Sequence, residues 1–186
     1  GNLKICICVR KRPVSQKEIK KKDFDSVTCL NPRVIVHDCK LKVDGITKYL
    51  DNTEFAFDYA FDEEMGTEDV YLATTQPLVD FILRKGRATV FEYGQTGSGK
   101  TYTMAGIQEY VAQDLFAALD QDDSHGLLVG VSFFEIYGGR CQDLLNHRHR
   151  LEVREDGKGE VNIAGLEEVE VRSYEDLLGM IELGNR

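Results

Sequence analysis

The first third of the chain alternates hydrophobic and polar positions in short runs, which is the pattern of β-strands. Leu3–Val9 predicts a core strand, and the polar stretch Arg10–Asp25 predicts a loop with one helical turn. Further short strands are expected over Ser26–Leu30, Val34–His37 and Ile46–Leu50.

A strong turn signal lies just before the last of these strands. Asp44-Gly45 favours a β-hairpin, because such turns need a positive φ that glycine adopts easily. The hairpin would place Lys42, Val43 and Asp44 at the tip of a finger.

Aromatic residues follow at every second position. Phe55, Phe57, Tyr59 and Phe61 alternate with small or acidic residues, which is the period of a half-buried strand. These rings are expected to lie in the core, as large aromatic side chains mostly do.

Helix signals begin at Thr67, where a capped start precedes a run that ends in basic residues and Gly86. Pro77 within this helix allows a kink. Further helices are expected from about Lys100, over Gln108–Leu119, and from about Ser173, where Asp176 completes a capping box.

Two strongly apolar runs, Ala88–Tyr93 and Leu127–Tyr137, predict buried strands. The segments RLEVRED, GEVNIAG and EEVEVRS add short strands before the last helix. The alternation of strands and helices is typical of an α/β domain. No internal repeat or low-complexity linker interrupts it, so residues 1–186 are expected to form one domain.

Composition agrees with a globular domain: 42% of the 186 residues are hydrophobic and 30% are charged, enough to bury a core. No apolar run has the roughly 18 residues that would span a bilayer, and the first residues do not have the order of a secretion signal. A soluble, intracellular protein with no membrane partner is therefore expected. The five cysteines have no metal-site spacing, so neither a disulfide framework nor a zinc site is expected.

Charge is unevenly distributed along the chain. The net charge is −9, yet residues 1–50 carry 12 Lys and Arg against 5 Asp and Glu. The acidic remainder argues against general nucleic-acid binding. The basic cluster either meets an acidic partner or is a solvated loop, and its members are Arg10, Lys11, Arg12, Lys17, Lys20, Lys21 and Lys22.

One motif carries clear chemistry. The eight residues from Gly94 to Thr101 fit GxxxxGK[ST] between a predicted strand and a predicted helix, which is the context of a phosphate-binding loop. Lys100 would reach the β- and γ-phosphates, and the Thr101 hydroxyl would ligate Mg²⁺. The residues expected to bind nucleotide here are Gly94, Gln95, Thr96, Gly97, Ser98, Gly99, Lys100 and Thr101.

A complete hydrolytic site also needs a second acidic residue on Mg²⁺ and a group that positions water. Neither can be identified in this chain, so no catalytic residue is assigned. Glu135 lies inside a predicted strand, and Glu92 is expected to be paired within the fold because an unpaired charge would repel phosphate.

The ordered motifs of the chain resemble those of the kinesin motor domain. They are VRKRP (Val9–Pro13), FDYAFDEE (Phe57–Glu64), VYLATTQPLV (Val70–Val79), FEYGQTGSGKTYTM (Phe91–Met104) and SFFEIYGGRCQDLL (Ser132–Leu145). The resemblance implies a P-loop NTPase kinesin-type motor core of α/β class, with a mixed central sheet flanked by helices and a small β-hairpin finger.

The same resemblance implies ATP as the nucleotide. Arg10, Arg12 and Pro13 would line the adenine side of the pocket, with Tyr102 stacking on the base; surface charge is the alternative for the two arginines. The chain ends where kinesins continue into their two switch regions and the main tubulin-binding helix. It is therefore expected to be the N-terminal half of a motor domain.

The segment KVDGITKYLDNTEFAFDYAFDEE (Lys42–Glu64) is similar to the kinesin-13 family, whose members depolymerise microtubules. In that family the residues equivalent to Lys42, Val43 and Asp44 touch tubulin. Three positions depart from the kinesin pattern. They are Gly45 after the aspartate, Glu92 in place of a small residue, and Gly106 joined directly to Ile107 without the usual loop.

These implications favour an ATP-driven, Mg²⁺-dependent motor that stabilises curved tubulin at microtubule ends. It is expected in the cytoplasm, on the microtubule cytoskeleton of a spindle or cilium. Three alternatives stay open. They are a translocating kinesin, a P-loop enzyme that is not a motor, and a non-enzymatic microtubule-binding module.

Overall fold

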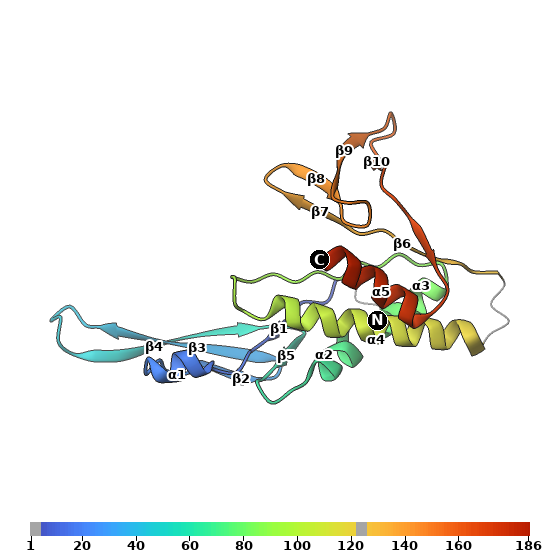
Figure 1. Ribbon diagram of the computed structural model, residues 1–186. Helices are drawn as coiled ribbons and strands as arrows, with labels where there is room; N and C mark the ends of the chain where they lie inside the picture. The colour runs from blue at the N-terminus through green and yellow to red at the C-terminus, as the bar shows by residue number, and fades with distance from the viewer. Residues whose placement is uncertain (1–4, 122–125) are drawn as a thin grey trace. The chain divides into compact units, whose positions relative to one another are not determined.

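The computed structural model describes residues 5–121 and 126–186. It divides into two compact units, Gly1–Ile107 and Gln108–Arg186. Figure 1 shows the strands and helices of both.

The first unit is built around one parallel strand pair. β1 (Cys8–Arg10) pairs with β5 (Tyr59–Phe61), and Lys11 N donates to Phe61 O at 2.8 Å beyond the last pair. The strand expected over Leu3–Val9 thus begins only at Cys8, while its first two residues lie outside the described part. Ala60 and Phe61 are buried and form part of the core.

The finger is a three-stranded antiparallel sheet. β2 (Val27–Leu30) pairs with the start of β3 (Arg33–Leu41), and β3 pairs over its whole length with β4 (Lys48–Ala56). The expected turn is confirmed, since Gly45 has φ 69° and Gly45 N donates to Lys42 O. In Figure 1 the β3–β4 ribbon extends well beyond β2, and the turn closes its far end.

The prediction of a single aromatic strand was wrong. The chain leaves β4 after Ala56 and enters β5 at Tyr59, because Asp58 N donates to Ile7 O and joins the β1–β5 pair instead of the finger. Phe61 is buried, but Phe55 and Tyr59 are 48% and 38% exposed. The alternation therefore crosses two sheets, and only part of it faces the core.

The helices of the first unit follow the sequence signals closely. α1 (Gln16–Lys20) is the single turn expected in the basic loop. α2 (Thr67–Thr74) and α3 (Gln76–Leu83) divide the long predicted helix, because proline near the start of α3 lacks the N–H of a continuous helix. Gly66 and Thr75 cap their N-termini without a side-chain hydrogen bond.

α4 (Lys100–Gln121) is one continuous helix that runs from the first unit into the second. The separate helical stretch expected over Gln108–Leu119 is its second half. Ile107, Ala112 and Phe116 are its buried apolar residues.

The strand predicted over Ala88–Tyr93 is not formed. Residues 88–93 have no ladder partner in the parts of the chain that the structure describes, and Phe91 and Tyr93 are 81% and 98% exposed. An apolar run becomes a buried strand only when neighbours cover it and take its backbone hydrogen bonds.

The described residues of the second unit form two antiparallel sheets. β6 (Val129–Val131) pairs with β11 (Val169–Val171), and the larger sheet has the strand order β10-β9-β8-β7. The long strand expected over Leu127–Tyr137 is split between the two sheets, with a break at residues 132–133. The strands of the larger sheet are β7 (Phe134–Tyr137), β8 (Arg140–Asp143), β9 (His149–Glu155) and β10 (Val161–Ala164).

The last helix is α5 (Tyr174–Asn185). Ser173 caps it as predicted, because the Ser173 hydroxyl accepts from Asp176 N at 3.1 Å. The Asp176 carboxylate accepts from Arg172 N, one residue earlier than in a standard capping box.

Within the described ranges, no helix is both long and apolar enough to cross a bilayer. The five cysteines are free thiols.

Candidate nucleotide site

The segment Gly94–Thr101 has the local geometry of a phosphate-binding loop. Gly97 and Gly99 have φ 82° and 102°, a region that residues with a Cβ rarely adopt. α4 begins directly afterwards at Lys100, so the free N–H groups of its first turn lie at the end of the loop. A glycine-rich turn at a helix N-terminus favours bound anions.

The Lys100 side chain folds back over the loop. Its Nζ donates to the carbonyl oxygens of Gly94 at 2.6 Å and Gln95 at 3.0 Å. A bound phosphate would offer the ammonium negatively charged acceptors in place of these two carbonyls. The loop residues and Lys100 therefore fit a nucleotide phosphate.

Thr101 lies exposed in the first turn of α4. A hydroxyl oxygen is the hard ligand that Mg²⁺ accepts together with phosphate oxygens. No group of three or more His, Cys, Asp or Glu residues in the described ranges is placed to hold a metal by itself. Thr101 therefore fits a metal that the nucleotide brings with it.

The structure brings together Arg10 and Tyr102, the two residues predicted to lie on the base side of the pocket. The Arg10 guanidinium lies 5.7 Å from the centroid of the Tyr102 ring. It is fixed by hydrogen bonds of 2.9 Å to the hydroxyls of Thr67 and Thr103 and of 3.3 Å to Met65 O. Tyr102 itself is 73% exposed, so one face of its ring is open.

Arg12 is held differently from Arg10. Its two terminal nitrogens donate to both carboxylate oxygens of Glu18, at 2.8 and 2.6 Å, and Nη1 also donates to Pro13 O. Glu18 in turn completes a capping box with Ser15 at the start of α1. Arg12 thus supports the α1 turn through Glu18, whereas Pro13 is exposed. The role of both residues beside adenine stays a prediction.

Glu92 stands two residues before the loop. The expectation that it is paired within the fold was wrong, because both carboxylate oxygens are buried and have no hydrogen-bond partner in the described part of the chain. Burial raises the Glu92 pKa, and the positive charges of Arg10 and Lys100 act in the opposite direction. Glu135, by contrast, forms an ion pair with Arg148 at 3.3 Å.

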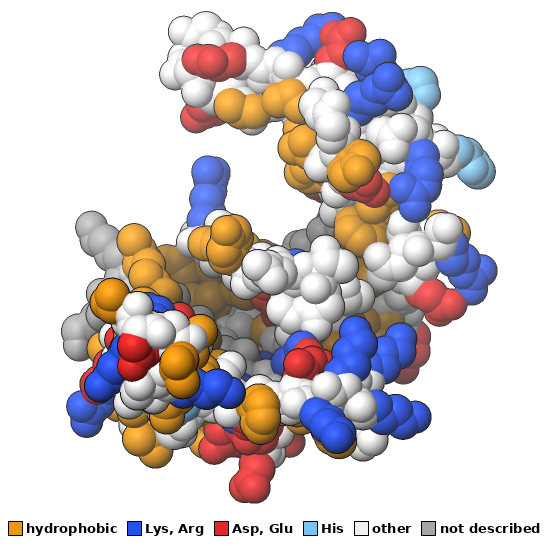
Figure 2. Space-filling model, turned by 90° about the vertical axis from the view of Figure 1, so that its left-hand side faces the viewer, with side chains coloured by type: hydrophobic (Ala, Val, Ile, Leu, Met, Phe, Trp, Pro, Cys, Tyr) orange, Lys and Arg blue, Asp and Glu red, His pale blue; other side chains and the backbone are white. Residues whose placement is uncertain are grey.

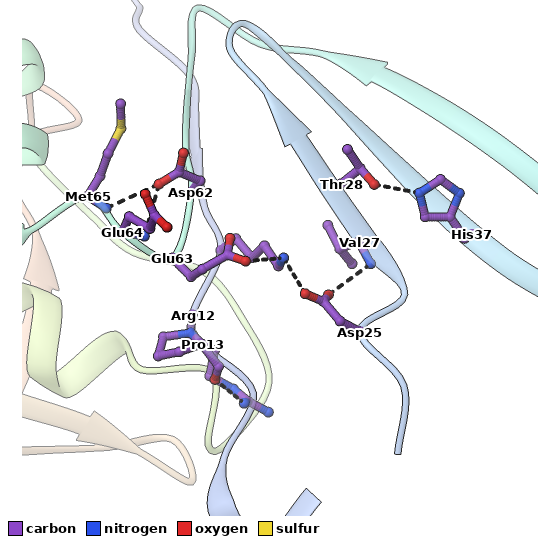
Figure 3. Close-up of polar contacts among 11 residues, drawn as sticks. Arg12, Pro13, Asp25, Val27, Thr28, His37, Asp62, Glu63, Glu64 and Met65 are labelled. Atoms are coloured by element: carbon purple, nitrogen blue, oxygen red, sulfur yellow. Dashed lines mark hydrogen bonds and ion pairs between the residues drawn. The ribbon is translucent and has the colours of Figure 1, made fainter. Parts of the chain in front are cut away.

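The sequence did not predict an ionic bridge at Lys11, the residue after Arg10. Lys11 Nζ contacts Asp25 at 2.6 Å and Glu63 at 2.9 Å, and its side chain is only 11% exposed. Figure 3 shows the two carboxylates turned toward one another, with two dashed lines that meet between them. The bridge joins the residues before β2 to those after β5, and so ties the base of the finger to the β1–β5 pair.

The fingertip combines an exposed apolar residue with a rigid turn. Val43 is fully exposed. Asp44 shapes the turn, because its carboxylate accepts hydrogen bonds of 2.9 Å from the N–H groups of Ile46 and Thr47. The Thr47 hydroxyl and these N–H groups hold the Asp44 pKa below its usual value. Figure 2 views the molecule from the side to which the hairpin extends in Figure 1. Hydrophobic side chains lie there between basic and acidic ones.

A phosphate loop at the start of a long helix in an α/β fold defines a P-loop nucleotide-binding protein. Comparison with known families narrows this class, because the family model "Kinesin motor domain" matches residues 10–186. The chain belongs to the kinesin motor domain family. The kinesin-type α/β fold expected from the sequence is thereby confirmed. Instead of one mixed central sheet, the strands in the described ranges form four separate sheets.

Two relatives are informative. Diatom spindle kinesin-1 of Cylindrotheca fusiformis is 54% identical over 185 residues, which is 99% of this chain and 30% of that protein. A solved structure of KIF14, a two-heads-bound dimer with AMP-PNP in complex with a microtubule, matches with a TM-score of 0.80 and 29% identity. The chain covers 54% of the KIF14 chain, so it spans about a third to a half of these relatives. Neither name is that of the kinesin-13 subfamily expected from the finger.

Proposed function

We propose that this chain is the ATP- and Mg²⁺-binding portion of a microtubule motor. The observation that carries the proposal is the Gly94–Thr101 loop, whose lysine is positioned over it and whose long helix follows at once. The KIF14 structure, which holds AMP-PNP on a microtubule, supports both the nucleotide and the partner.

Each residue of the site has a definite task in this proposal. Lys100 exchanges the Gly94 and Gln95 carbonyls for the β- and γ-phosphates, and Thr101 holds Mg²⁺ on the same phosphates. Arg10 supports Tyr102 from one side, which leaves the open face of the ring for adenine. Bound Mg²⁺ would neutralise phosphate charge. No residue that the structure describes is assigned as the acid or the water-positioning group of hydrolysis.

We propose further that the motor depolymerises microtubules through the finger. The support is the tip itself: Lys42 and Val43 project from a turn that Asp44 holds rigid. A motor removes tubulin subunits only if it binds bent protofilaments more tightly than straight ones. Tip contacts available only on bent tubulin would supply this difference, and the lysines in and after α1 suit an acidic partner. Such a motor acts on the microtubule cytoskeleton.

The main alternative is a translocating motor. The KIF14 complex supports this reading, because two heads of a dimer bind its microtubule at once. In a translocating motor the finger is a side feature, and removal of its tip side chains has no effect on microtubule length.

The test uses the full-length motor with stabilised microtubules and ATP, and scores tubulin released to the supernatant after sedimentation. Lys42→Ala/Val43→Ala removes the tip side chains and keeps the Asp44 turn, so it probes contact without loss of shape. Asp44→Asn, which keeps one acceptor oxygen, is the control for turn geometry. Lys100→Ala is the control with weakened nucleotide binding, and omission of ATP is the nucleotide-free control.

Release by the wild type and loss of release in Lys42→Ala/Val43→Ala support a depolymerase that works through the finger. Microtubule-stimulated ATP hydrolysis without release supports the translocating motor. ATP hydrolysis that is indifferent to microtubules contradicts the motor proposal and leaves another P-loop enzyme. Microtubule binding without hydrolysis indicates a non-enzymatic binding module.

A further inference from the structure

Glu92 is an unusual group to find beside a phosphate-binding loop. Its two carboxylate oxygens are shielded from solvent, and no described residue donates a hydrogen bond to either. A buried carboxylate without a donor is costly, so such groups are rare in folded proteins. Its place two residues before Gly94 makes the nucleotide site the natural context for its role.

The cations that act on Glu92 are engaged elsewhere. Arg10 and Lys100 are the charged groups whose fields reach the carboxylate. Arg10 donates to Thr67, Thr103 and Met65 O, and Lys100 donates to two loop carbonyls. The two cations therefore offset the negative charge of Glu92 only through space, without a hydrogen bond to its carboxylate.

A bound phosphate would disturb this balance. The phosphate oxygens would neutralise Lys100, which is one of the two charges that favour ionised Glu92, and would add negative charge of their own. Both effects favour the protonated carboxylic acid. Burial already raises the Glu92 pKa in the free protein, and bound nucleotide would raise it further. At a pH between the free and the bound pKa, the carboxylate therefore takes up a proton when nucleotide binds.

We propose that Glu92 couples the phosphate-binding loop to a proton: ionised Glu92 weakens nucleotide binding, and tight binding transfers one proton from solvent to its carboxylate. The proposal rests on the nucleotide-binding function proposed above and deepens it. In the pH interval between the free and bound pKa of Glu92, affinity falls as pH rises, by up to tenfold per pH unit for one proton. Below and above that interval the effect is constant.

The experiment is calorimetric titration of Mg·ADP into the full-length motor from pH 5 to pH 8, a range that begins just above the ordinary pKa of a glutamate. At each pH two buffers of different ionisation enthalpy are used, so that proton uptake is measured directly. Glu92→Gln removes the titrating group at nearly constant size, and Glu92→Ala introduces a small residue in case the glutamine is poorly tolerated. Glu68→Gln, on the exposed start of α2, is the matched control.

The wild type and Glu68→Gln should take up more protons than either Glu92 variant, and their affinity should fall relative to the Glu92 variants as pH rises. Protons bound by ADP itself are common to all four proteins and cancel in this comparison. Equal proton uptake and a constant affinity ratio across the pH range would overturn the coupling while nucleotide binding stands. Absence of Mg·ADP binding in every protein would overturn the proposed function itself.

Discussion

Lys100 is the side chain on which nucleotide binding most depends. Its two carbonyl partners show that the ammonium already lies over the loop before any phosphate arrives. Lys100→Ala should weaken Mg·ATP binding by about 10- to 150-fold, because a hydrogen bond to a charged group contributes about 1.5–3 kcal/mol. Equilibrium titration with a fluorescent ATP analogue checks this, and an unchanged dissociation constant would contradict the assigned role.

Glu18 gives a prediction that depends on pH. Arg12 and the Ser15 N–H hold its pKa far below the ordinary value. The contribution of this carboxylate to folding is therefore complete above pH about 4.5 and is lost as pH falls below that value. Arg12→Gln should raise the Glu18 pKa toward its ordinary value, as measured by carboxyl ¹³C titration. If the Glu18 titration is the same in both proteins, the Arg12 pair does not form in solution.

At the scale of single residues, the sequence predicts the features that a short motif specifies. The positive φ values of Gly97 and Gly99 and the place of Lys100 follow from local spacing. Local spacing does not predict that Arg12 pairs with Glu18 or that Glu92 has no hydrogen-bond donor among the described residues, because both depend on how the folded chain arranges these groups. The family resemblance places Arg12 beside the nucleotide, which stays a prediction, and the ion pair of Arg12 with Glu18 is a contact that the resemblance does not indicate.

Helix α5 offers a matched pair of glycines. A Cβ on Gly184 would meet the Phe133 ring at 2.2 Å, whereas a Cβ on Gly179 has no neighbour within 4 Å. Gly184→Ala should lower the free energy of unfolding by about 1–3 kcal/mol through overpacking. Gly179→Ala should raise it by about 0.5–1 kcal/mol, because alanine is the better helix former.

Chemical unfolding of the motor followed by circular dichroism measures both changes. Opposite signs are the expected result. Equal effects of the two substitutions would mean that Phe133 does not pack on α5.

Elements were predictable where their signals are local. The Asp44-Gly45 turn, the Ser173 cap and the break at Pro77 all follow from side chains within four residues. The run Ala88–Tyr93 was misassigned because a strand is defined by its partner, and no described strand pairs with it. The aromatic alternation likewise predicted the period of a strand without indicating that two sheets share it.

At the scale of the whole molecule, the Lys11 bridge is the contact most open to test. Lys11 pairs with two residues that lie 14 and 52 positions later in the chain, so no local sequence pattern predicts the bridge. Its hydrogen bonds hold the pKa of both Asp25 and Glu63 below the usual values. Lys11→Met removes the cation and leaves two carboxylates facing one another.

The loss of stability in Lys11→Met should be largest at neutral pH, where both carboxylates are ionised. It should shrink as pH falls below about 4.5, where the carboxylates of the variant become protonated. Urea unfolding at pH 7 and pH 4 measures the difference, and Lys11→Arg, which keeps the charge, is the control. A loss that is the same at both pH values would assign Lys11 a packing role only.

The length of the finger determines how far its tip reaches. β3 and β4 pair from Arg33 with Ala56 out to Leu41 with Lys48, nine residues on each strand, while β2 supports only the inner end. At about 3.4 Å per residue this ribbon spans roughly 30 Å, and this length sets the distance from the base of the finger to its tip. Two extra residues in each strand would move the tip outward by about 7 Å with every side chain on its original face, whereas one extra residue in each would exchange the faces. The reach of the finger can therefore be changed in steps without a change in its chemistry.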